Sequence, residues 1–133
     1  MAKKILIIED ESYLLDMYKT KFRQAGYEVD GTTDGAEGIQ MAEKMLPDLV
    51  LLDLVMPGMD GYEVLEKIKK NPKTKGAKAY ILSNLGQNGE IKKGFQSGAD
   101  GYLIKSDFTP GELAKAIDKI FQGEPVGADK KSD

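Results

Sequence analysis

The sequence contains no cysteine and no histidine. Without cysteine there are no disulfides, no thiolate zinc ligands and no cysteine nucleophile. Without histidine there is neither a Ser-His-Asp triad nor an imidazole ligand for a metal ion. Any metal that this protein binds must therefore be held by oxygen atoms, which favours Mg²⁺, Mn²⁺ or Ca²⁺.

Long apolar runs are also missing. The first apolar run, at residues 5–8, is too short for a signal peptide or a membrane span, so we expect a cytoplasmic protein. No G-x-G-x-x-G follows this run, and G-x-x-x-x-G-K-[ST] does not occur in the chain. The lack of both patterns argues against a nucleotide-binding domain.

The chain has no excess of positive charge. Its 19 Lys and Arg residues stand against 22 Asp and Glu residues, a net charge of -3. This balance lacks the electrostatic footprint of a nucleic-acid-binding protein. We interpret the one lysine-rich region, residues 67–78, as a solvated helix end and loop, and we expect no direct binding to nucleic acid or membrane.

Short apolar runs alternate with stretches of helical periodicity, which predicts an α/β fold. With 133 residues, 41% hydrophobic and 31% charged, one globular domain is expected. We predict strands at residues 5–8, 27–29, 50–52, 80–82 and 102–104, and helices around residues 14–25, 36–46, 64–68, 91–95 and 113–121. Five such β–α units predict a parallel sheet that is covered by helices on both faces. We expect the domain to occupy residues 1–122, followed by a disordered tail at 123–133 with little apolar content.

Polar side chains follow four of the predicted strands. Glu9 and Asp10 follow the first, Asp53 the third, Ser83 the fourth and Lys105 the fifth. In an open parallel sheet, ligands bind outside the carboxyl ends of the strands. We therefore expect these five side chains to lie around one site.

Crowded carboxylates repel one another, and a divalent cation removes that conflict. We predict a Mg²⁺ site (Mn²⁺ is possible) with Asp10 and Asp53 as ligands, the backbone carbonyl of Val55 as a third ligand, and Glu9 bound through water. Asp53 is then a candidate nucleophile that forms an acyl phosphate. Ser83 and Lys105 are candidates to hold the phosphoryl oxygens.

Four segments, IIEDE, LVLLDLVMPGMDG, ILSN and ADGYLIK, occur in the order and spacing of a known family. Over residues 3–121 the chain resembles the receiver domain of response regulators, the CheY-like family of two-component signalling. The resemblance implies a doubly wound, three-layer flavodoxin-like fold with five parallel strands in the order 2-1-3-4-5. It also implies that Asp53 accepts a phosphoryl group, with Mg²⁺, from a sensor histidine kinase or a histidine phosphotransfer protein.

The resemblance further implies a single-domain response regulator that is not a turnover enzyme and loses its phosphoryl group slowly by itself. Ser83 and Tyr102 would form the switch, although a half-buried edge-strand tyrosine is the alternative for Tyr102. The surface of the fourth helix, fifth strand and fifth helix would contact a downstream protein. The chain would be a monomer or a weak dimer through that surface.

Two residues depart from the family pattern. Ser106 stands where a proline usually follows the lysine, and Asn84 stands where a small residue usually follows the hydroxyl residue. These departures keep open an alternative, a receiver-like binding module that acts without phosphorylation. A phosphatase with an aspartyl-phosphate intermediate fits less well, because Val55 occupies the position at which such enzymes need a second acid.

Overall fold

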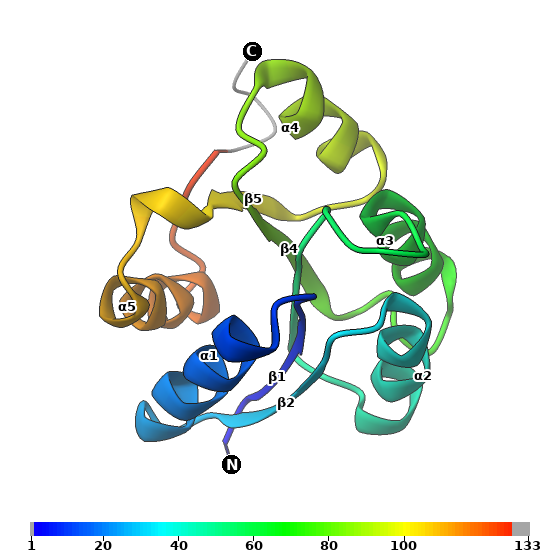
Figure 1. Ribbon diagram of the computed structural model, residues 1–133. Helices are drawn as coiled ribbons and strands as arrows, with labels where there is room; N and C mark the ends of the chain where they lie inside the picture. Colours follow the sequence, from blue (N-terminus) through cyan, green and yellow to red (C-terminus); the bar gives the residue numbers. More distant parts are fainter. Residues whose placement is uncertain (1, 129–133) are drawn as a thin grey trace.

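The computed structural model describes residues 2–128 and shows five β–α units (Figure 1). The elements are β1 (Lys4–Ile8), α1 (Ser12–Gln24), β2 (Glu28–Thr32), α2 (Gly35–Met45), β3 (Leu49–Leu52), α3 (Gly61–Lys70), β4 (Lys78–Ser83), α4 (Asn88–Gln96), β5 (Gly101–Ile104), the 3₁₀ turn η1 (Lys105–Asp107) and α5 (Pro110–Phe121). No helix of the part described is long and apolar enough to cross a membrane.

All strand pairs in the sheet are parallel, in the order β2-β1-β3-β4-β5. This order confirms the expected fold class. Ile8 pairs with Leu52 on β3, and Ser83 pairs with Ile104 on β5. These pairs stand at the carboxyl ends of their strands, so the residues that follow them lie side by side at one edge of the sheet. That edge carries the predicted site.

Helices cover both faces of the sheet. Figure 1 shows α1 and α5 on one face and α2, α3 and α4 on the other. Along β1, Ile5 and Ile7 face the core under α1 and α5, whereas Leu6 and Ile8 face the core on the opposite side. Each such buried side chain contributes about 1.5–3 kcal/mol. Burial on both faces explains why β1 and β3 read as continuous apolar runs.

The start of α5 matches its sequence signal. The Thr109 hydroxyl accepts a hydrogen bond from the Glu112 N–H, and the Glu112 carboxylate accepts one from the Thr109 N–H. This reciprocal pair is a capping box, which the sequence Thr109-Pro110-Gly111-Glu112 by itself predicts, with Pro110 at the first helical position. The cap fixes the connection between η1, which begins at Lys105, and α5.

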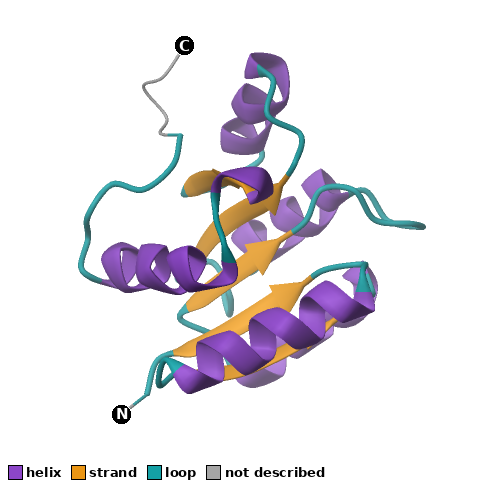
Figure 2. Cartoon of the chain, turned by 60° about the vertical axis from the view of Figure 1, so that its left-hand side comes forward, coloured by secondary structure: helices purple, strands orange, loops and turns teal. Residues whose placement is uncertain are grey.

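Residues 123–128 run from the end of α5 to the outer edge of β5, as both views show (Figures 1 and 2). The Ala128 N–H donates to the Tyr102 carbonyl oxygen over 3.1 Å, and Val126 packs against the core on the α5 side. We predicted a disordered tail from residue 123. The composition gave no sign of the contact at 123–128, and residues 129–133 lie outside the described part.

We expect Gly127→Val to release this segment without unfolding the domain. Gly127 has φ +71°, and a Cβ there would lie 2.4 Å from the Tyr102 carbonyl oxygen, so a β-branched residue does not fit. Hydrogen exchange at the Ala128 amide should accelerate. The free energy of unfolding should fall no further than in a chain that ends at Gly123. A valine variant that is less stable than this truncated chain would contradict the prediction.

Candidate functional site

The carboxyl ends of β1, β3, β4 and β5 surround an open cavity of about 190 Å³. The structure thus brings the predicted strand-end residues together. The cavity is lined by Asp10, Glu11, Asp53, Val55, Ser83, Asn84, Leu85 and Lys105.

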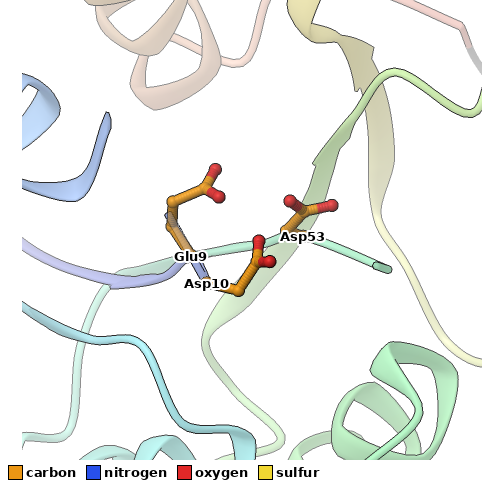
Figure 3. Close-up of side chains that lie close together, drawn as sticks. All are labelled: Glu9, Asp10 and Asp53. Carbon is orange, nitrogen blue, oxygen red and sulfur yellow. The ribbon is translucent and has the colours of Figure 1, made fainter. Parts of the chain in front are cut away.

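Three carboxylates converge beside this cavity. Glu9, Asp10 and Asp53 each offer one oxygen, and these oxygens all lie within 4.8 Å of one another. Figure 3 shows the three side chains pointing into the same space from two neighbouring strand ends. Glu9 and Asp53 are 1% and 5% exposed, so their mutual repulsion is poorly screened by solvent.

Lys105 compensates part of this negative charge. Its ammonium lies 2.6 Å from Glu9 Oε1 and 2.8 Å from Asp53 Oδ2, with only 12% of the side chain exposed. Burial alone would lower the pKa of Lys105, but the hydrogen bonds to Asp53 and Glu9 raise it above its ordinary value. Lys105 therefore stays protonated and bridges the two acids.

The Glu9 carboxylate has more protein partners than we predicted from the sequence. Besides Lys105, its carboxylate contacts the Glu11 N–H over 3.2 Å, so the side chain is already held by protein donors. Burial raises the pKa of Glu9 to about 7, although both of these donors act in the opposite direction. Its predicted role, binding a metal through water, stays a prediction, whereas its pairing with Lys105 was not anticipated.

Asp53 is positioned by the end of β3. Its N–H donates to the Ile8 carbonyl over 2.9 Å, and its Oδ1 accepts from the Val55 N–H over 3.1 Å. The other oxygen faces Lys105. The start of α3 approaches this turn closely, since a Cβ at Gly61 would lie 2.8 Å from the Asp53 carbonyl oxygen. The glycine at the end of LVLLDLVMPGMDG is thus required by close packing.

Ser83 and Tyr102 both contact the backbone of Leu85. Ser83 Oγ accepts from the Leu85 N–H over 3.2 Å, and the Tyr102 hydroxyl donates to the Leu85 carbonyl. Tyr102 is fully buried, so the alternative of a half-buried edge tyrosine is wrong. Burial also raises the pKa of Tyr102 above its ordinary range, which keeps the hydroxyl a donor. The contacts of Leu85 had no sequence signal, because they involve only its backbone.

The peptide bond between Lys105 and Ser106 is not cis, and no cis peptide bond occurs within residues 2–128. Instead, Lys105–Asp107 form the turn η1, and the Ser106 N–H donates to Asn84 Oδ1 over 3.0 Å. Sequence reasoning treated Asn84 and Ser106 as separate departures and missed their contact.

The carboxylate oxygens at this edge are suitable ligands for a hard cation. Carboxylate oxygens from Asp10 and Asp53 are close enough to share one ion, and Asp10 is only partly buried beside the open cavity. Mg²⁺ prefers such oxygen ligands, keeps several waters, and tolerates the few protein ligands available here.

Comparisons with known proteins agree with this geometry. The family model described as response regulator receiver domain matches residues 5–118. The chemotaxis protein CheY of Thermotoga maritima is 32% identical over 122 residues, covering 90% of this chain and 98% of that protein. Among solved structures, chemotaxis protein CheY4 of Vibrio cholerae superposes with a TM-score of 0.84 at 28% identity, covering 90% and 99% of the two chains.

Longer relatives match only in part. The transcriptional regulator RpaA of Synechocystis is 37% identical over 102 residues, which are 77% of this chain but 42% of RpaA. In the response regulator PleD of Caulobacter vibrioides, the matched part is 23% of the protein. This chain therefore spans less than half the length of these two relatives. With the family match spanning most of its length, this chain belongs to the response regulator receiver domain family.

Proposed function

We propose that Asp53 accepts a phosphoryl group from a phosphohistidine of a histidine kinase or a histidine phosphotransfer protein. One observation supports this most directly. Asp53 directly follows the central strand β3, and its carboxylate borders the open cavity and lies between the largely buried ammonium of Lys105 and two further acids.

The transfer needs one bond made and one bond broken. A carboxylate oxygen of Asp53 attacks the phosphorus, and the bond from phosphorus to the imidazole nitrogen breaks with its electron pair going to the imidazole. Lys105 can then turn its ammonium from the carboxylate to a phosphoryl oxygen. The Ser83 hydroxyl can donate to another phosphoryl oxygen, because it borders the same cavity. The product is a signalling state, so we expect no turnover on external substrates.

We also propose that the acids at this site bind Mg²⁺. Asp10 and Asp53 would hold the ion together with the Val55 carbonyl, and Glu9 would reach it through water. When bound, the ion supplies positive charge that neutralises phosphoryl oxygens. Incubation with acetyl phosphate and Mg²⁺, followed by intact-mass measurement, tests the proposed function directly. A chain that takes up no phosphoryl group would favour the alternative, a binding module that acts without phosphorylation.

Asp10→Asn should weaken Mg²⁺ binding at least about tenfold, because it removes one of two carboxylate ligands. Isothermal titration calorimetry measures the dissociation constant. Glu28→Gln is the matched control, since Glu28 is an exposed acid at the opposite end of the sheet. Equal affinities of the Asp10 variant and the wild type would remove Asp10 from the proposed ligand set.

We propose that the signal leaves through the α4–β5–α5 face to a downstream protein. Beryllofluoride, a mimic of the phosphoryl group, should shift amide resonances mainly in residues 83–89 and 99–106, with little change in α2. The reason is that Ser83 and Tyr102 hold the Leu85 peptide from two sides, so a moving Ser83 hydroxyl must disturb both loops. Ser83→Ala should reduce these shifts, whereas the surface change Lys44→Ala should not. Shifts confined to the loop after Asp53 would contradict the role of Tyr102.

A further inference from the structure

Asn84, which lines the cavity, is in direct contact with Ser106. Asn84 Oδ1 accepts a hydrogen bond from the Ser106 N–H over 3.0 Å. Asn84 directly follows Ser83, and Ser106 directly follows Lys105. The hydrogen bond therefore joins the backbone beside one proposed phosphoryl-binding group to the backbone beside the other.

The contact extends the connection between β4 and β5. The paired residues of these strands end at Ser83 and Ile104, so Asn84 and Ser106 lie beyond the sheet. Ser106 lies in the turn η1. In this turn, the Phe108 N–H donates a hydrogen bond to the Lys105 carbonyl over 3.2 Å. The first N–H groups of a helical turn have no partner within the turn. Asn84 supplies that partner from a different strand end, as a capping side chain does.

The contact also suits a role in activity more than in folding. Asn84 and Ser106 are both exposed, so neither side chain contributes much to the core. Asn84 nevertheless lines the cavity at Asp53, as do Ser83 and Lys105. An exposed hydrogen bond at this position holds the orientation of the two loops at little cost to the packing of either.

We propose that Asn84 is a positioning residue, which ties the loop after β4 to the turn after β5. Through this tie, the Ser83 hydroxyl and the Lys105 ammonium reach the phosphoryl group on Asp53 together. Without this hydrogen bond, the loop after β4 and the turn after β5 would have to reach their active positions independently of each other. This inference rests on the proposed phosphorylation of Asp53, and its test separates the two.

The first measurement needs no phosphorylation. In the full chain, Asn84→Ala should shift the Ser106 amide proton upfield and accelerate its hydrogen exchange. Asn88→Ala is the matched control, since it makes the same chemical change at an exposed residue, the first of α4. An unchanged Ser106 amide in the Asn84 variant would overturn the proposed tie.

The second measurement follows phosphorylation by acetyl phosphate in Mg²⁺. Asn84→Ala should lower the rate constant at saturating donor about threefold to tenfold, the range for losing one hydrogen bond. The donor concentration for half-maximal rate should stay the same. A raised half-saturating concentration with an unchanged rate constant would show that Asn84 binds the donor instead, and would overturn a positioning role.

Ser106→Pro gives an independent check, because proline has no N–H for Asn84 to accept. In that background, Asn84→Ala should cause no further loss of rate. A further loss as large as in the wild-type background would show that Asn84 acts through another contact. If the wild type itself takes up no phosphoryl group, the proposed function fails, while the Ser106 amide still reports whether the tie exists.

Discussion

Asp53→Asn is expected to abolish phosphorylation by acetyl phosphate in Mg²⁺, lowering the rate by more than about a thousandfold. An amide oxygen has almost the shape of the carboxylate oxygen that it replaces, but it is not a nucleophile at neutral pH. Lys105 and the Val55 N–H donate to different oxygens of Asp53, so the single amide oxygen of the variant can take the place of only one of these two acceptors. Intact-mass spectra should show one phosphoryl group on the wild type and none on the variant.

The control separates loss of the acceptor from a general effect of the Asp→Asn change. Asp16→Asn makes the same change on the exposed surface of α1 and should be labelled like the wild type. Asp10→Asn should be labelled more slowly, with part of the rate restored by excess Mg²⁺. Equal labelling of the Asp53 variant and the wild type would place the acceptor elsewhere, with Asp10 as the next carboxylate in the cavity.

Lys105→Met is expected to lower the free energy of unfolding by about 3 kcal/mol when no metal is present. Methionine keeps an apolar stem of similar length but removes the only cation that contacts Glu9 and Asp53 in the described residues. Both acids then remain buried without a positively charged partner and keep only the backbone hydrogen bonds from Glu11 and Val55. Chemical denaturation in the presence of a chelator measures the loss, and Mg²⁺ should restore part of it.

The opposite change in charge serves as the comparison. Asp53→Asn removes one of three crowded carboxylates and leaves Lys105 paired with Glu9. Without metal, it should therefore leave the unfolding midpoint unchanged or raise it. Lys105→Arg keeps the positive charge and should lose less stability than Lys105→Met. An unchanged midpoint for Lys105→Met, or a clear loss for Asp53→Asn, would show that charge crowding does not govern the stability of this edge.

The architecture and the location of the site follow from local patterns in the sequence. Residues 5–8 and 50–52 read as apolar runs because a central parallel strand is buried on both faces. The capping box at Thr109 satisfies orphan N–H groups within four consecutive residues, so its signal is contained in the sequence. Asp53 and Lys105 were placed at the same edge because the carboxyl ends of parallel strands always meet there.

Contacts between loops were decided only by the tertiary structure. Glu9 pairs directly with Lys105, the buried Tyr102 hydroxyl donates to the Leu85 carbonyl, Asn84 binds the Ser106 N–H, and Ala128 binds the Tyr102 carbonyl on β5. Each of these contacts joins residues far apart in the chain and depends on strand register, loop path and side-chain reach together. Periodicity reports which face of an element is buried, but a hydrogen bond between two loops leaves no periodic trace. For that reason the sequence showed positions 84 and 106 only as two separate departures from the family pattern, whereas the structure shows that these two residues are hydrogen-bonded to each other.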